Sequence, residues 1–132
     1  MIIIACVDDN FGLMFNLRRQ SKDREVTKRI CEITKGEKLL ISEYSKSLFE
    51  DCNVCVDNMF LEKADKGDFL FIEDTNNIDF NKVEKIILFF WNRVYPCDLI
   101  LDIPKGYKEV YSKEFPGFSH DIIREVHYEK VD

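Results

Sequence analysis

The stretch KIILFFW (85–91) decides the fold of this 132-residue chain. Every residue after Lys85 in it is apolar, so neither face of the segment suits contact with water. A run of this length, rich in β-branched and aromatic residues, predicts a strand that is covered on both sides. We therefore expect a sheet in which 85–91 is a central strand, with packed layers above and below it.

Before this strand, short apolar runs alternate with segments of helical character. Ser21 is the expected N-cap of the main helix, in which Val26, Ile30 and Ile33 share one face. Residues 8–20 begin with turn residues and show no clean period, which predicts a structured loop. The other predicted strands and helical pieces are, in chain order, MIIIACV (1–7), KLLIS (38–42), YSKSLFED (44–51), NVCVD (53–57), MFLEKAD (59–65), DFLFIED (68–74), residues 80–84 and LILDI (99–103).

The tail of the chain has a different pattern. YKEVYSKEF (107–115) and DIIREVHYEK (121–130) alternate in polarity around a turn, which predicts an antiparallel hairpin at a sheet edge. The earlier alternation of strands and helices implies parallel pairing through right-handed crossovers. We therefore predict one α/β domain over residues 1–132. It contains a mixed, mostly parallel sheet with helices on both faces and a C-terminal antiparallel hairpin.

Composition excludes some classes of function. With 25 acidic and 19 basic residues the net charge is −6, which argues against general binding to nucleic acids. The N-terminal apolar run is too short for a signal peptide or a membrane helix. Five scattered cysteines are typical of a reducing compartment, so we expect a soluble, cytoplasmic protein. Cys52 and Cys55 form a C-x-x-C without further ligands nearby, so we interpret them as structural and expect no metal site.

The order of elements resembles the dihydrofolate reductase fold. MIIIACVDDNFGL (1–13) resembles that family's opening strand and loop, and GYKEVYSKEF…HDIIREVHYEK (106–130) resembles its closing hairpin. IILFFWNRVY (86–95) stands where the family has a strand, a glycine turn and a helix. The resemblance implies a carboxylate on the first helix that assists protonation of the pterin, and Asp23 and Glu25 lie in that stretch.

The chain departs from the family where the cofactor would bind. The resemblance implies a glycine turn that admits the cofactor pyrophosphate, but Phe90, Trp91 and Asn92 occupy that place. Pro96 and the next predicted strand leave little room for a helix after Tyr95. We therefore expect no cofactor and no NADPH-dependent reductase activity.

A second resemblance rests on CVDDN (6–10), RRQSKDR (18–24) and WNRVYP (91–96). These segments resemble a family of small uncharacterised proteins from anaerobic Gram-positive bacteria, some of which are labelled ribonuclease Z. True ribonuclease Z needs several histidines and aspartates around two zinc ions. This chain contains only His120 and His127 and has no HxHxDH cluster, so its residues do not support that label.

Two groups of polar residues follow predicted strands whose carboxyl ends share one edge of the sheet, where ligands bind in α/β proteins. The first group is Asp8, Asp9 and Asn10, and the second is Asn92, Arg93 and Tyr95. The first group is either a site for a ligand or Mg²⁺, or a turn in which the carboxylates accept hydrogen bonds from their own backbone. Beside the second group, Trp91 either stacks with Tyr95 on a planar ring of a ligand or belongs to the core.

The densest cationic group precedes and enters the main helix. It comprises Arg18, Arg19, Gln20, Ser21 and Arg24. Backbone amides at a helix start, together with arginines, suit a phosphate, a carboxylate or a nucleotide. The alternative is that these arginines pair with Asp8, Asp9 or Asp23.

The positions of the two histidines in the sequence do not indicate a catalytic role for either of them. Ser119 and His120 are adjacent in sequence, whereas a nucleophile and its base must converge in space. We therefore expect His120 to be an exposed turn residue and His127 to face outward from its strand.

Three functional hypotheses follow. The first is a module that binds a small anionic or nucleotide-like ligand between residues 18–24 and the ends of strands 1–7 and 85–91. The second is a hydrolase or other enzyme that uses Asp8 or Asp9 in the same cleft. The third is a protein–protein interaction domain that uses the edge of the tail hairpin.

Overall fold

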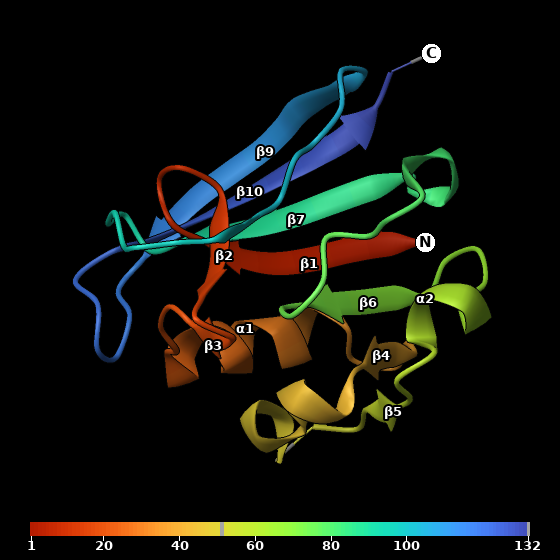
Figure 1. Cartoon of the computed structure of the whole chain (residues 1–132), viewed down its shortest axis with the longest axis horizontal. Coiled ribbons are helices and arrows are strands. Elements are labelled where there is room, and N and C mark those ends of the chain that lie inside the picture. Colours follow the sequence, from red (N-terminus) through yellow and green to blue (C-terminus); the bar gives the residue numbers. More distant parts are fainter. Residues whose placement is uncertain (51, 132) are drawn as a thin grey trace.

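A seven-stranded mixed sheet forms the centre of the molecule, in the order β5-β4-β6-β1-β7-β10-β9 (Figure 1). The computed structural model describes residues 1–50 and 52–131. β7 pairs with β1 in parallel and with β10 antiparallel, which confirms the prediction of a central strand. The strands of this sheet are β1 (Ile2–Val7), β4 (Leu39–Ile41), β5 (Cys55–Val56), β6 (Phe69–Ile72), β7 (Lys85–Phe90), β9 (Tyr107–Phe115) and β10 (Ile123–Lys130).

A second, three-stranded sheet corrects two of the predictions. It comprises β2 (Gly12–Phe15), β3 (Arg18–Arg19) and β8 (Leu99–Ile100), so residues 8–20 are not only loop. The strand expected at 99–103 is β8, which pairs with β2 and so lies outside the large sheet, where β10 is the neighbour of β7. β2 and β3 are joined through Asn16 and Leu17, whose φ values of 55° and 62° suit a two-residue hairpin. Leucine is unusual at positive φ, so this turn gives no sequence signal.

The helical elements cover both faces of the large sheet. One face, which includes Ile4 and Phe89, packs against Val26 and Ile30 of α1. The other face, which includes Ala5 and Leu88, is covered by residues of α2, β2 and the segment after β8. The prediction of a mixed α/β sheet with helices on both faces is therefore confirmed. The helical elements are α1 (Arg24–Ile33), α2 (Phe60–Lys63) and the 3₁₀ helices η1 (Glu43–Phe49) and η2 (Phe80–Lys82).

Several details of the helical predictions are settled by the structure. The helical piece expected over 44–51 is η1, and Asp51 lies outside the described residues. The N-cap of α1 is Asp23 and not Ser21, because the Asp23 side chain accepts a hydrogen bond from the backbone N–H of Glu25. In the part of the chain that is described, no helix is long and apolar enough to cross a membrane.

The sheet centre supplies a test of the two-layer core. Phe89 is fully buried in β7 and makes an edge contact with Phe115 of β9, with 6.3 Å between ring centroids. We expect Phe89→Ala to lower the free energy of unfolding by about 3–5 kcal/mol, because it leaves a cavity between the sheet and α1. Val110→Ala, at a position of β9 that is 43% exposed, should change it by only about 0.5 kcal/mol. Urea denaturation measures both, and equal losses would contradict this description of the core.

Candidate functional site

Asp8 organises the turn that follows β1. Its side chain is fully buried, and Oδ1 accepts hydrogen bonds from the backbone N–H groups of Asn10 and Gly12. Oδ2 accepts from Gln20 Nε2 and from the backbone N–H of Tyr95, each at 3.1 Å. Burial acts to raise the pKa of Asp8, but these hydrogen bonds outweigh it and hold the pKa below its usual value. The turn-chemistry alternative therefore accounts for this carboxylate, while Asp9 and Asn10 are exposed.

Arg19 has a structural partner that the sequence did not indicate. Its guanidinium forms two hydrogen bonds with the buried carboxylate of Glu73, at 2.7 and 3.0 Å, instead of pairing with Asp8, Asp9 or Asp23. Ser45 Oγ donates to the same carboxylate at 2.8 Å, and the ring of Tyr44 lies 4.7 Å from the Arg19 guanidinium. This group joins β3 to the end of β6 and to η1.

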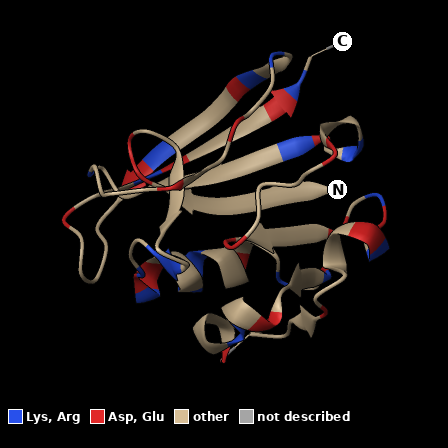
Figure 2. Ribbon diagram, in the orientation of Figure 1, with Lys and Arg blue, Asp and Glu red and all other residues tan. Residues whose placement is uncertain are grey.

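The other arginines are placed differently from one another. Arg24 lies over the exposed ring of Phe118 at 3.5 Å, and Arg93 is exposed in the segment after β7. Arg18 is exposed on β3, and within residues 1–50 and 52–131 no carboxylate forms an ion pair with it. Figure 2 shows β3 in blue beside the start of α1. The three arginines of the predicted cationic group therefore have different surroundings. Arg19 is paired with Glu73, Arg24 is stacked on Phe118, and Arg18 has no acidic partner among the described residues.

Asp23 connects the start of α1 to the turn between β9 and β10. Oδ1 accepts from the backbone N–H groups of Glu25 and Phe118, and Oδ2 accepts from that of Ser119, each at 2.9 Å. His120 Nδ1 lies 2.8 Å from Oδ2, and neither of these two side chains is more than 4% exposed. Burial alone would raise the pKa of Asp23, but the hydrogen bonds hold it far below its usual value.

His120 is buried, so the prediction of an exposed turn histidine is wrong. Its ring stacks on that of Trp91 with centroids 4.6 Å apart, and its Nε2 lies 2.9 Å from Ser21 Oγ. The sequence could not show this, because Ser21 and Asp23 lie 99 and 97 positions away from His120. His127 is also only 12% exposed, since its Nε2 bonds Glu125 Oε2 at 2.6 Å, so the prediction that it faces outward is wrong.

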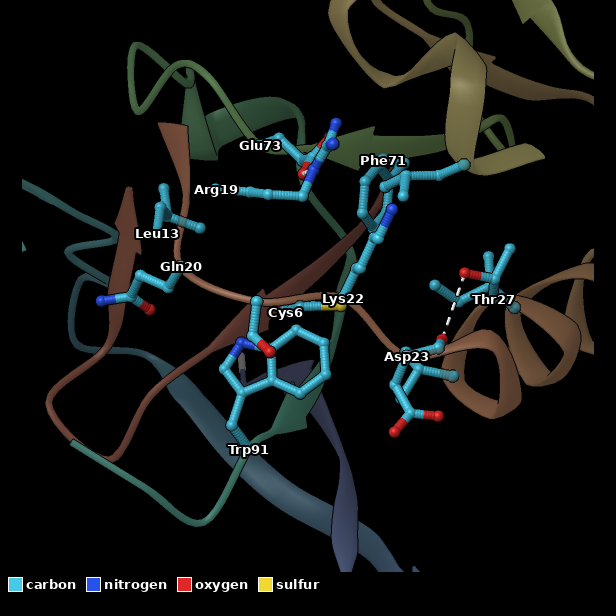
Figure 3. A pocket seen from close by; sticks show the side chains of 14 residues that line it. Cys6, Leu13, Arg19, Gln20, Lys22, Asp23, Thr27, Phe71, Glu73 and Trp91 are labelled. Atoms are coloured by element: carbon cyan, nitrogen blue, oxygen red, sulfur yellow. Dashed lines mark hydrogen bonds and ion pairs between the residues drawn. The ribbon is translucent and has the colours of Figure 1, made fainter. Parts of the chain in front are cut away.

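Two spaces adjoin the segment that runs from β3 to α1. A narrow cavity of about 20 Å³ lies between β1, β6 and α1, and Figure 3 shows side chains from several elements around it. An open hollow of about 490 Å³ lies on the other side of the segment. The hollow is lined by Phe15, Asn16, Arg18, Arg19, Gln20, Tyr95 and Pro96. The residues that line the cavity include Cys6, Ser21, Lys22, Asp23, Val26 and Trp91.

The hollow brings together only part of the predicted site. Arg18, Arg19, Gln20 and Tyr95 line it, and Ser21 lines the adjoining cavity. The remaining predicted residues are on neither wall: Asp8, Asp9, Asn10, Arg24, Asn92 and Arg93. No group of three His, Cys, Asp or Glu side chains among the described residues is arranged to hold a metal ion.

Comparison with known proteins agrees with the fold. No protein-family model and no curated protein sequence matches this chain. Among solved structures the chain is similar to a dihydrofolate reductase from Enterococcus faecalis complexed with NADP(H) and RAB-propyl, with a TM-score of 0.67 and 11% sequence identity. The similarity covers 100% of this chain and 97% of that one, which confirms the expected dihydrofolate reductase-like fold.

The Asp23 hydrogen bonds predict a dependence of stability on acid. The pKa of Asp23 is lower in the folded state than its unfolded value of about 3.9. The ionised carboxylate therefore makes its full contribution to the free energy of unfolding at any pH above the unfolded pKa. This contribution is lost as the pH falls through the folded pKa, an effect on the order of 2 kcal/mol. We expect Asp23→Asn to flatten the decline in unfolding free energy that urea titrations show between pH 5 and pH 2. Asp121→Asn, at an exposed position, is the control; an unchanged decline in Asp23→Asn would contradict the assignment.

Proposed function

We propose that this chain binds a small anionic ligand that carries a flat ring, in the hollow between β3 and residues 95–96. The observation that carries the proposal is Arg18, an exposed cation that shares the hollow with Tyr95 and has no acidic partner among the described residues. A guanidinium binds phosphate or carboxylate oxygens through paired hydrogen bonds. The ring of Tyr95 supplies an adjacent surface for stacking.

The sizes of the two spaces favour the hollow as the ligand site. Sites for small molecules have volumes of about 300–1,000 Å³, and the hollow has about 490 Å³. The cavity has about 20 Å³, which holds about one water molecule. A nucleotide-sized ligand therefore fits the hollow and would need side-chain rearrangement to enter the cavity.

Gln20 adds a polar group to this wall. Its Nε2 donates to Asp8 Oδ2 at 3.1 Å, which fixes the amide, while its Oε1 is buried and has no partner among the described residues. Because this oxygen is buried, a ligand in the hollow can donate to it only if the amide turns. Gly12 allows Gln20 to approach this closely, since a Cβ at Gly12 would lie 2.6 Å from Gln20 Nε2.

The proposal excludes NADPH-dependent reduction. The similar reductase structure is described as a complex with NADP(H), so the fit of that cofactor here can be tested on the residues after β7. Trp91 is buried against His120, Asn92 makes the turn with φ 58°, and residues 91–98 contain no helix to present its N-terminus to a pyrophosphate. These residues do not fit the cofactor. The Asp23 carboxylate is also occupied by backbone N–H groups and His120, which argues against a role in protonating a bound pterin.

An enzyme that uses Asp8 or Asp9 is less well supported by the geometry. Asp8 is buried and accepts four hydrogen bonds, two within its own turn and two from Gln20 and Tyr95, so it has little capacity to accept a proton or bind a metal. Asp9 is exposed and lines neither space.

Binding of adenosine monophosphate tests the proposal. Hydrogen bonds to charged groups contribute about 1.5–3 kcal/mol, and 1.4 kcal/mol is tenfold in affinity. We expect Arg18→Ala to raise the Kd at least about tenfold in isothermal titration calorimetry. Tyr95→Leu should weaken the nucleotide but not inorganic phosphate, because it removes only the stacking surface.

Arg93→Ala is the matched control, since it removes an exposed arginine near the same sheet edge that does not line the hollow. We expect it to bind adenosine monophosphate as the wild type does, and NADPH to show no binding to any variant. Absence of nucleotide and phosphate binding to the wild type, or equal effects of Arg18→Ala and Arg93→Ala, would contradict the proposal.

A further inference from the structure

Three side chains from two distant parts of the chain meet at the edge of the cavity. Ser21 Oγ lies 2.9 Å from His120 Nε2, and His120 Nδ1 lies 2.8 Å from Asp23 Oδ2. In this order a hydroxyl contacts one ring nitrogen and a buried carboxylate contacts the other, which is how a nucleophile, a general base and an orienting group are connected. We propose that Ser21 and His120 are the nucleophile and general base of an acyl-ester hydrolase site, with Asp23 as a positioning residue.

The proton positions follow from the hydrogen bonds. Asp23 is ionised and accepts from three backbone N–H groups, so it has no proton to offer and Nδ1 of His120 must donate to it. In the neutral ring Nε2 is then the acceptor, and the hydroxyl of Ser21 donates to it. This is the tautomer in which the imidazole can take a proton from the serine.

The surroundings keep the histidine in this orientation. Trp91 stacks on one face of the ring at an interplanar angle of 22°, and the backbone N–H groups of Phe118 and Ser119 anchor the carboxylate that holds Nδ1. Two further hydroxyls lie farther from the ring nitrogens, that of Tyr95 at 3.5 Å from Nε2 and that of Ser119 at 3.3 Å from Nδ1. Ser21 is therefore the hydroxyl nearest to Nε2.

The reaction balances with water as the only co-reactant. Ser21 Oγ attacks the ester carbonyl carbon while its proton passes to His120 Nε2, and that proton then goes to the alcohol as the ester C–O bond breaks. Water attacks the resulting acyl-serine, gives a proton to Nε2, and Ser21 recovers that proton as the carboxylic acid leaves.

The volumes of the two spaces indicate the class of substrate. Ser21, Cys6 and Val26 line the narrow cavity, so only a short acyl group such as acetyl can be placed there after small side-chain movements. Arg19 and Gln20 line both spaces, so the alcohol portion can extend from Ser21 into the open hollow. A small acyl ester of a larger alcohol meets both requirements.

The test uses two probes on the full chain, 4-nitrophenyl acetate for turnover and a fluorophosphonate for covalent labelling. We expect a burst of nitrophenol, and labelling that peptide mapping assigns to Ser21. Ser21→Ala and His120→Gln should each lower kcat/KM by about 100-fold or more, whereas Ser47→Ala, which removes an exposed hydroxyl of η1, should not. The ester carries no negative charge, so this outcome does not depend on anion binding by Arg18.

Controls separate a catalytic role from a structural one. Circular dichroism and thermal unfolding establish that each variant is folded, and His120→Gln retains a side chain that can bond Ser21 and Asp23. We expect Asp23→Asn to lower kcat with KM unchanged, because it disturbs the orientation of the histidine and not the binding of the ester. Equal hydrolysis by the wild type and Ser21→Ala, labelling at another residue, or no labelling of the wild type would overturn the proposal.

Discussion

The carboxylate of Asp23 is the contact on which the arrangement of this molecule's candidate site depends. It accepts hydrogen bonds from the start of α1 and from the turn between β9 and β10, segments that are about 95 residues apart in the chain. A carboxylate that is this deeply buried is stable only when its oxygens are paired, and here backbone N–H groups supply the pairing. Oδ2 of the same carboxylate also contacts Nδ1 of His120, so this turn histidine is held in place by a contact with the start of α1.

A second constraint separates the two arginines of β3. Arg19 faces Glu73 and forms a two-pronged ion pair in which the carboxylate is only 8% exposed, so breaking it would leave a buried charge without a partner. Arg18 is the preceding residue of the strand, and successive residues of a strand point to opposite sides. One arginine therefore holds β3 to β6, and the neighbouring arginine is left at the open hollow. The Arg-Arg pair in the sequence is thus divided between a structural role and a proposed binding role.

Sequence reasoning predicted the parts of the fold that depend on local pattern. The apolar run at 85–91, the first strand and the alternating tail lie where they were expected. A strand that is buried on two faces has a continuous apolar sequence, and a strand that is buried on one face alternates in polarity. The Asp8 turn was also among the alternatives, because an Asp after a strand bonds its own backbone. β8 was assigned to the wrong sheet, since two residues of apolar sequence do not say which edge they pair with.

The candidate site was harder to predict because its contacts are long-range. Glu73 was not considered as the partner of Arg19, since it lies 54 positions further along the chain at the end of a buried strand. Ser21 was assigned to the helix cap, a place that Asp23 takes two residues later. His120 beside Ser119 suggested only a turn, and Ser21, the serine that contacts its Nε2, lies 99 positions away in the sequence. Composition and spacing carry no information about such a pairing until the strand order is known.

The two proposed activities differ in their electrostatic environment. Arg18 is exposed, so its attraction for an anion acts through water and is weakened by salt over a distance of about 8–10 Å. Asp23 and His120 are almost completely removed from solvent, and Trp91 covers the ring, so their interaction is screened far less. Ionic strength therefore acts on the hollow and leaves the Asp23–His120 pair nearly unaffected. A ligand that spans both spaces would have its anionic end held by a salt-sensitive contact and its acyl end placed beside a salt-insensitive one.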